Sequence, residues 1–270
     1  VKSNFSKASK LANRFYLQSY NSVFKGNSTL ENELYHSAKI RYRRFSMYKG
    51  IMLNASVNYT KKLDGYRNAV EFNGINQFLT IQMLENPSEN WSALTSLRKK
   101  IKNIRYKIHG NYNNATYLQN VNNVFSTNKN ENYAITVGVE TLFDNFPTIE
   151  VGFKRSIGNY TSNNTTTKFT TNEPYVYIDY DFLKGFIFNF DYTRYNYQNK
   201  QQGLKNDYEL ANVTLSYKND DSAWSYKITA QNLFNSQFKQ NNSFSNNYSI
   251  FEHIYLNVKY PLFQLIYNTL

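Results

Sequence analysis

The chain is 270 residues long, has no cysteine and carries a formal net charge of +12, from 31 Lys and Arg against 19 Asp and Glu. The lack of cysteine excludes disulfides and cysteine-based zinc sites, and no segment approaches the roughly 18 to 20 apolar residues that a membrane-spanning helix needs. Aromatic residues make up 17% of the chain, yet its mean hydropathy is −0.65. This combination favours a protein wall with one apolar and one wet face over a soluble core of Leu, Val and Ile.

The basic excess admits three interpretations: nucleic-acid binding, attraction to anionic lipid, or a basic lining of a water-filled interior. Nucleic-acid binding predicts basic residues gathered on one patch or helix, whereas here they are scattered among polar strand positions and loops. We therefore favour the other two and expect no nucleic-acid partner. The chain begins at Val1 without an initiator Met or an apolar signal segment, so we expect a processed product or a piece of a longer protein.

Residues 1–33 are predicted to be an irregular lead-in with one strand near 11–24, followed by a polar loop at 26–33. From about residue 34, apolar and polar residues alternate, which indicates strands with two different faces. The pattern is weaker between 61 and 101, because Gly65, Gly74 and Pro87 interrupt it. It returns near residue 104, and the Asn-rich stretch 111–132 is predicted to be a long polar loop.

The second half alternates more regularly. Strands are predicted around 133–139, 149–153, 176–182, 186–192, 211–217 and within 255–268, with polar loops at 159–172, 199–206 and 235–247. The clearest strand lies in 223–234, AWSYKITAQNLF. Trp224, Tyr226, Ile228 and Ala230 share one side of this strand, and polar residues occupy the other.

The loop lengths carry more information than any single strand. Short connections at 48–50, 102–103, 143–147, 183–185 and 218–222 alternate with the long polar stretches. An outer-membrane barrel has this asymmetry, with short periplasmic turns and long extracellular loops, whereas a soluble sandwich has no reason for it. We therefore predict an all-β, antiparallel transmembrane β-barrel with about 11 or 12 strands present, located in the outer membrane of a Gram-negative bacterium with its C-terminus periplasmic. A soluble all-β protein, such as a lectin-like sandwich, is the alternative.

Three motifs occur in the order found in one known family. The stretch WSYKITAQNLFN resembles that family's penultimate strand; its characteristic residues are Trp224, Asn232, Leu233, Phe234 and Asn235. GNSTLENE, residues 26–33, is similar to a mid-barrel Gly-Asn-Pro-x-Leu-x-x-Glu loop, with Ser28 where Pro is usual. YPLFQLIYNTL, which contains Tyr267, resembles the closing strand, with Leu270 in place of the terminal aromatic. The family is the TonB-dependent receptors of bacterial outer membranes, especially those of Bacteroidota.

The resemblance implies a 22-stranded barrel preceded by a globular plug, with 34–270 forming the C-terminal half. Its implied partners are outer-membrane lipid and lipopolysaccharide, the missing plug and N-terminal half of the barrel, and a surface lipoprotein lid or other outer-membrane complex subunits. The implied function is energised import of a nutrient such as a siderophore, glycan or peptide. The alternatives are a receptor-like scaffold subunit of a secretion or assembly complex, and a soluble or cell-surface carbohydrate-binding β protein.

The sequence offers little support for catalysis. His36, His109 and His253 are far apart and form no HExxH or i, i+4 pair, so we expect no metal site, no cofactor and no enzyme. Three carboxylates, Asp179, Asp181 and Asp191, share the polar face of one predicted hairpin, and we interpret them as solvated charges.

A basic group near two of the short turns is the remaining candidate site. Its members are predicted to line the lumen near its periplasmic end, where they would grip an acidic plug or guide an anionic substrate. The alternative is an ordinary hydrated inner wall. The residues are Lys39, Arg41, Arg43, Arg98, Lys100, Arg105 and Lys107. The sequence assigns no substrate-binding residue.

Overall fold

The computed structural model describes residues 1–162, 165–218, 224–236, 238–244, 249–255 and 262–267. These residues form an all-β protein, in which the described part contains one helix, the single turn α1 (Ala8–Leu11). Among the described residues, no helix is long and apolar enough to cross a membrane.

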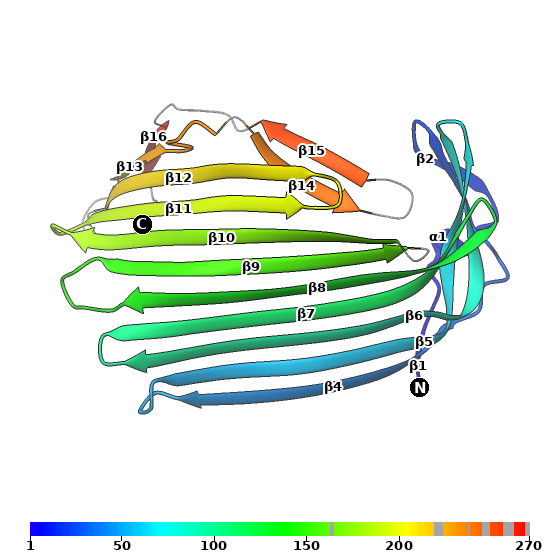
Figure 1. Cartoon of the computed structure of the whole chain (residues 1–270), viewed down its shortest axis with the longest axis horizontal. Helices are drawn as coiled ribbons and strands as arrows, with labels where there is room; N and C mark the ends of the chain where they lie inside the picture. Colours follow the sequence, from blue (N-terminus) through cyan, green and yellow to red (C-terminus); the bar gives the residue numbers. More distant parts are fainter. Residues whose placement is uncertain (163–164, 219–223, 237, 245–248, 256–261, 268–270) are drawn as a thin grey trace.

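The long strands in the middle of the sheet lie side by side along the length of the molecule (Figure 1). The described residues form 16 strands. They are β1 (Lys2–Asn4), β2 (Phe15–Ser19), β3 (Ser22–Lys25), β4 (Glu33–Ser46), β5 (Ile51–Asn73), β6 (Asn76–Ile101), β7 (Ile104–Val121), β8 (Val124–Thr141), β9 (Thr148–Ser162), β10 (Thr165–Phe182), β11 (Phe186–Asn199), β12 (Leu204–Lys218), β13 (Trp224–Ala230), β14 (Phe238–Phe244), β15 (Ser249–Tyr255) and β16 (Leu262–Tyr267).

One sheet contains 14 of these strands, and β14 and β15 form a separate pair. From β4 to β13 each strand pairs with the next one in antiparallel orientation, and β16 then pairs with β13. Within the described part the sheet does not close, so β4 and β16 lie at opposite sides of an open structure. The sequence predicted about 11 or 12 strands, and it missed the short strands of the lead-in.

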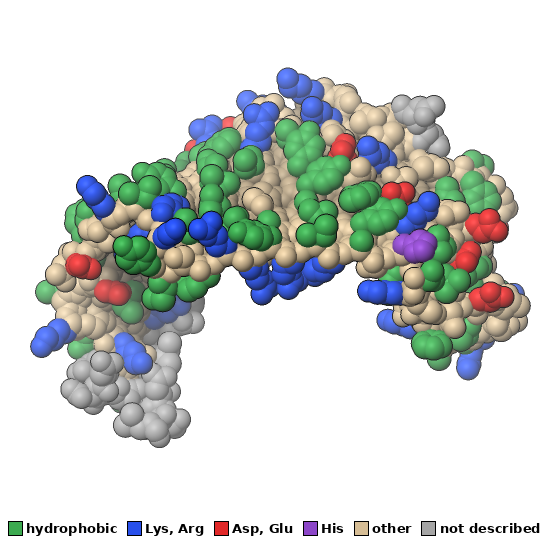
Figure 2. All heavy atoms as spheres, turned by 90° about the horizontal axis from the view of Figure 1, so that it is seen from below, with side chains coloured by type: hydrophobic (Ala, Val, Ile, Leu, Met, Phe, Trp, Pro, Cys, Tyr) green, Lys and Arg blue, Asp and Glu red, His purple; other side chains and the backbone are tan. Residues whose placement is uncertain are grey.

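The ladder register gives the sheet one apolar and one polar face. Residues paired directly across antiparallel strands point to the same face, and successive residues point to opposite faces. One row joins Ile108, Val137 and Phe153, while the neighbouring row joins Lys107 to Gly138. The sheet arches, with hydrophobic side chains on its outer surface and a group of Lys and Arg projecting into the hollow (Figure 2).

The prediction of long polar loops was wrong. The stretch 111–132 is the tip of a hairpin in which β7 and β8 stay paired up to a two-residue turn at Asn122 and Asn123. Both turn residues have positive φ, 50° and 63°, a conformation that asparagine tolerates. In the stretch 159–172, residues 159–162 end β9 and residues 165–172 begin β10, so the described part is strand. The stretch 199–206 does contain a turn, at 200–203, but it is short and lies between the ends of β11 and β12, and 235–247 contains β14. These hairpin extensions need no apolar face, because the backbone ladder satisfies its own hydrogen bonds.

The short turns are confirmed at one end of the sheet, at 48–50, 102–103, 143–147 and 183–185, whereas 218–222 lies largely outside the described residues. Because the opposite end also has tight turns, the two ends differ in how far the hairpins extend. The region 61–101 is also regular strand. A bulge between Lys62 and Asp64 accommodates Gly65, whose α-carbon faces buried Pro87 on β6.

The lead-in, residues 1–33, is more ordered than predicted. Instead of one strand near 11–24, it contains the hairpin β2–β3, with β3 running parallel to β6. Phe24, Leu30 and Ile81 form a small buried cluster that holds the lead-in against the long β5–β6 hairpin. This cluster explains why the lead-in folds, since the sheet's own apolar face lies elsewhere.

Candidate functional site

The seven predicted basic residues share the polar face of the sheet. Arg98 pairs with Lys107, and Lys100 pairs with Arg105, across the β6–β7 ladder. Lys39, Arg41 and Arg43 occupy alternate positions of β4, opposite polar residues of β5. The sheet therefore brings all seven to the concave side, next to the short turns.

Two of these residues belong to an ion-pair network across β7, β8 and β9. Arg105 Nη1 lies 2.7 Å from Glu140 Oε2, and Lys107 Nζ lies 3.1 Å from Glu140 Oε1 and 2.8 Å from Glu150 Oε2. Glu150 also accepts a hydrogen bond of 3.0 Å from the hydroxyl of Tyr175 on β10. Both carboxylates are largely shielded from solvent. The network fixes neighbouring strands to one another and leaves Arg105 and Lys107 neutralised.

The other five basic residues are different. Among the residues that the structure describes, no carboxylate forms an ion pair with them, and Arg43 Nε donates a 3.3 Å hydrogen bond to Asn54 Oδ1. Arg98, Lys100 and Arg105 also line a hollow of about 370 Å³ near the Ser46–Met47 turn. These five basic residues therefore lie on β4 and β6, beside the open edge of the sheet.

An aromatic side chain lies flat over glycines next to the network. A Cβ on Gly152 would lie 2.2 Å from Tyr175 Cζ, and one on Gly138 would lie 2.8 Å from the Tyr175 hydroxyl. Gly138, Gly152 and Tyr175 occupy one row across β8, β9 and β10. The two glycines thus make room for the ring, and the ring positions its hydroxyl against Glu150. Sequence inspection identified neither glycine as important, because only the register places them beneath the ring.

The Asn-Leu-Phe-Asn motif forms a tight turn after β13. Asn232 is 5% exposed, has a φ of 52°, and exchanges hydrogen bonds of 2.9 Å with Ser236 in both directions through its side-chain amide. Its backbone N–H donates to Asn212 Oδ1 at 3.0 Å. The Leu233 N–H donates to a β12 carbonyl, that of Ala211, at 2.9 Å. The motif therefore ends one strand and attaches the following segment to β12.

The remaining members of this motif contact the apolar face. The ring of Phe234 meets Tyr192 edge to face, with 5.8 Å between centroids. Asn235 has a φ of 55°, and Trp224 begins β13 with 44% of its surface exposed. In the closing strand, Tyr267 pairs with Trp224 across β13 and β16, whereas Leu270 lies outside the described residues.

The residues of GNSTLENE that match the family loop, Gly26, Asn27, Leu30 and Glu33, each have a structural role. Gly26 passes so close to the chain that a Cβ would lie 2.3 Å from the carbonyl oxygen of Ala12. The Asn27 side chain accepts a 2.9 Å hydrogen bond from the Thr29 N–H, and Leu30 enters the lead-in core. Glu33 is buried and forms an ion pair with Lys62. The motif thus joins the lead-in to β4 and β5.

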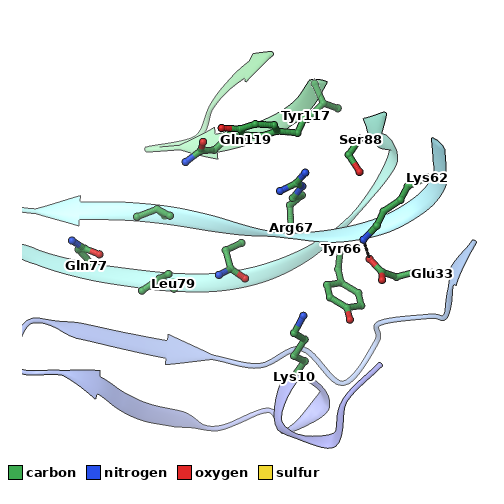
Figure 3. Close-up of a pocket in the computed structure, with 13 residues that line it drawn as sticks. Lys10, Glu33, Lys62, Tyr66, Arg67, Gln77, Leu79, Ser88, Tyr117 and Gln119 are labelled. Atoms are coloured by element: carbon green, nitrogen blue, oxygen red, sulfur yellow. Dashed lines mark hydrogen bonds and ion pairs between the residues drawn. The ribbon is translucent and has the colours of Figure 1, made fainter. Parts of the chain in front are cut away.

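A polar pocket of about 570 Å³ lies at the end of the sheet opposite the short turns, between α1 and strands β5, β6 and β7 (Figure 3). Three cationic residues from two elements line it: Lys10 of α1, and Lys62 and Arg67 of β5. Glu33 is the one carboxylate among its lining residues. No sequence motif pointed to this pocket, because its residues come from five segments, α1 and β4 to β7, that only the lead-in fold brings together.

The carboxylates and histidines do not form a metal site in the described part, where no three potential ligands lie close enough together to hold an ion. His36 and His109 lie on different ladders. Asp179 and Asp191 accept hydrogen bonds of 2.7 Å from Asn189 and Asn212 respectively, as solvated carboxylates on a wet face do.

Comparison of the chain with protein-family models and with curated proteins gave no match. The fold and the site therefore define the protein only as an open, arched, all-β sheet with an apolar outer face and a charged inner face.

Proposed function

We propose that this chain is part of an outer-membrane β-barrel similar to a TonB-dependent receptor, which imports a nutrient under energy supplied from the inner membrane. The observation that carries the proposal is the continuous apolar outer face. Side chains that would be buried in a soluble protein are open to the surroundings there, including Ile40 at 74%, Ile135 at 52% and Ile228 at 45% exposure. Exposed apolar patches of this extent mark a surface that is covered by lipid or by another protein.

The position of the apolar residues along the strands supports lipid rather than protein. One row of directly paired residues begins with Tyr112, Tyr133 and Ile157 on β7, β8 and β9, which are all apolar. Followed across the sheet to β11, the same row reaches the polar residue Gln198, whereas the last apolar residue on that face of β11 is Tyr192. The apolar segment thus shifts along the strands from one strand to the next. A horizontal band on tilted strands has this stagger, as barrel closure requires.

The arrangement of the two ends also fits a receptor barrel. The tight turns at one end correspond to the periplasmic side, and the extended polar hairpins with the lead-in correspond to the exterior. The open edge at β4 pairs with β1 over Glu33–Tyr35 and leaves later residues, including Arg41, with a free ladder edge in the described part. An exposed strand edge of this length accepts a further strand, as the first half of a larger barrel would supply.

The inner face supports a plug or a substrate as its occupant. A positive surface on β4 and β6 is suited to an acidic partner. It is formed by basic residues that have no ion pair within the described part, namely Lys39, Arg41, Arg43, Arg98 and Lys100. Arg105 and Lys107 are less suited to this role, because Glu140 and Glu150 already neutralise them.

Fractionation and gel migration test the barrel. We expect the protein in outer-membrane fractions, soluble only with detergent, and migrating differently on gels before and after heating. A stable monomer in plain buffer would contradict the barrel and favour a surface carbohydrate-binding β protein.

Uptake measurements separate import from a scaffold role. We expect a deletion strain to lose accumulation of one nutrient, and the parent strain to lose the same accumulation when an uncoupler is added. Normal uptake of siderophores, glycans and peptides together with defective secretion would favour the scaffold. Charge reversal at Arg41 and Arg43 tests the inner face, with reversal at Lys184 in the β10–β11 turn as the control; unchanged uptake would rule out a role in guiding substrate.

A further inference from the structure

The polar pocket between α1 and strands β5, β6 and β7, at the end of the sheet opposite the short turns, has an excess of positive charge. Its lining holds three cations, Lys10, Lys62 and Arg67, against one carboxylate, Glu33, which leaves two net positive charges. Lys62 and Glu33 form an ion pair, so their charges cancel. The excess therefore resides on Lys10 and Arg67.

The environment of Arg67 makes this excess unusual. The side chain is half-buried, and burial lowers the pKa of its guanidinium, against the smaller opposing effects of Tyr117 and Glu33. Within the described residues, no ion pair or hydrogen bond from a side chain or backbone group reaches this guanidinium. A half-buried charge without a bonded counter-charge is costly, so a bound anion would stabilise it.

Aromatic rings support both cations without using their donors. The Arg67 guanidinium lies 4.9 Å from the centre of the Tyr117 ring, and Lys10 Nζ lies 3.9 Å from that of Tyr66. A guanidinium over a ring face keeps its five N–H groups free in its own plane. In Figure 3 the Arg67 side chain extends from β5 toward Tyr117 and Ser88. The rings thus hold the cations in place while their donors remain available.

The elements around the pocket are fixed. The Asn27 N–H donates to the Lys10 carbonyl at 2.8 Å, the Asn27 side chain donates to the Ile81 carbonyl at 3.2 Å, and the Gln77 N–H donates to the Asn21 carbonyl at 2.7 Å. These bonds tie α1 and the lead-in to β6. A pocket that is formed in advance binds its ligand without a further ordering cost.

We propose that this pocket binds an oxyanion, the phosphate or carboxylate group of a ligand, with Arg67 as the main donor and Lys10 as a supporting charge. A planar guanidinium matches the spacing of two oxygens on either group. The inference goes beyond transport, since the lining residues all belong to this chain, and binding can be measured on purified protein without membranes or energy.

Calorimetric titration of the purified chain in neutral detergent, at constant ionic strength, tests the proposal. The probes are inorganic phosphate, citrate and lipid A in mixed micelles. Saturable binding of phosphate or citrate indicates a free solute, whereas binding of lipid A alone indicates an oxyanion presented by a lipid headgroup. No saturable binding of any probe would overturn the proposal.

Substitutions locate the site. We expect Arg67→Gln to weaken binding about tenfold or more, since it removes a charge-assisted bidentate contact, and Lys10→Gln to weaken it less. Lys184→Gln, in the turn between β10 and β11 at the other end of the sheet, is the matched control. Circular dichroism checks that each variant retains its β structure; if Arg67→Gln does not, Lys10→Gln decides. Retained affinity in the variant that decides, or an equal loss in the control, would overturn the assignment.

If the pocket does not bind an oxyanion, the proposal of an outer-membrane barrel is unaffected. If the protein is not a barrel, the proposal of oxyanion binding is likewise unaffected. Heat-modifiable migration and outer-membrane location do not depend on Arg67. Anion binding in detergent does not depend on uptake, so the two proposals fail separately.

Discussion

At the scale of single residues, the packing of the polar face depends on two glycines as much as on the side chains around them. Tyr175 can lie across β9 and β8 only because Gly152 and Gly138 lack a Cβ. The ring then reaches Glu150, which also holds Lys107. Glycine within a strand costs conformational entropy and is usually a weakness. Here that cost is offset by an aromatic contact spanning three strands and by the ion pairs beside it.

The first prediction follows from this contact. We expect Gly152→Ala to destabilise the sheet by about 1–3 kcal/mol, because the new methyl group would overlap the Tyr175 ring. Gly110→Ala is the matched control, since its Cβ would meet the nearest atom, Thr95 Cγ2, at an ordinary 3.8 Å. Denaturant midpoints of the two variants in detergent measure the difference. Equal midpoints would show that the ring yields without cost.

A second prediction concerns the turn after β13. Asn232→Ala removes both amide bonds to Ser236 and places a residue with a Cβ at a φ of 52° without local compensation. We expect a loss of about 1–3 kcal/mol. Asn232→Gly restores the backbone freedom but not the hydrogen bonds, so its loss should be smaller. If the two variants unfold at the same denaturant concentration, backbone conformation contributes nothing.

A third prediction uses pH. Arg194 donates to Asp207 through Nε at 2.9 Å and Nη2 at 2.8 Å, beyond the apolar segment of β11 and β12. These hydrogen bonds, with a further one from Asn196, lower the pKa of the Asp207 carboxyl, while burial opposes them. A carboxyl whose pKa is lower in the folded chain stabilises the fold above its unfolded value of about 4, and this contribution is lost as the pH falls through the folded value.

The unfolding midpoint should therefore fall on acidification from about pH 6 to about pH 3, and Asp207→Asn should reduce the part of this fall that the pair contributes. Denaturant titrations at a series of pH values measure it. Asp144→Asn in the exposed turn before β9 is the control. Parallel curves for the unaltered chain and Asp207→Asn would show that the pair adds no stability.

At the scale of elements, the lead-in shows how a polar end of a sheet acquires its own core. The extended hairpins beyond the apolar segment have two wet faces, so they cannot hold another element by burial alone. Phe24 and Leu30 supply the missing apolar contact against Ile81. They also place α1, and with it Lys10, at the edge of the cationic pocket.

We expect Phe24→Ala to release the lead-in without unfolding the sheet. Removing a buried Phe side chain costs about 3–5 kcal/mol. We expect this loss to outweigh the remaining attachments of the lead-in, which include the short pairing of β3 with β6 and the hydrogen bonds of Asn21 and Asn27. Hydrogen exchange should rise in 1–33 and remain slow in β7–β10. Phe15→Ala, at a position 65% exposed, is the control. Faster exchange throughout the sheet would contradict this local role.

The sequence predicted elements well where their two faces meet different surroundings. Between 133 and 139, alternation revealed β8, because its apolar residues share one face. From 111 to 132 the same ladder continues with polar residues on both faces. Periodicity therefore carries no signal there, and the composition predicts a loop. Near Gly65, the bulge between Lys62 and Asp64 interrupts the alternation, so the sequence pattern is weak there although the chain is strand. The cationic pocket lined by Lys10, Lys62 and Arg67 could not be predicted from the sequence, because long-range contacts through Phe24 bring its residues together.

At the scale of the whole molecule, the arch separates two environments. The outer side is apolar over its central part, and the inner side carries ion pairs and a positive area by the open edge at β4. A soluble sheet of this size would cover one face with helices or a second sheet. The described residues leave the apolar face open. Whether lipid or water contacts this face therefore distinguishes the membrane barrel from the soluble alternative.

A pair of arginine substitutions at adjacent positions of β8 decides this question. Val137 lies on the outer face, midway along the apolar segment 133–139, and Thr136 lies on the inner face. In a membrane, Val137→Arg places a charge near the middle of the bilayer and should cost about 2–4 kcal/mol in folding into lipid vesicles, measured by urea titration. Thr136→Arg meets water inside the arch and should cost much less. In a soluble protein the order reverses, because arginine at an exposed apolar position is harmless and improves solubility. Equal or better folding of Val137→Arg would therefore contradict the membrane barrel, whereas selective loss in lipid would identify the outer face as the surface that contacts the bilayer.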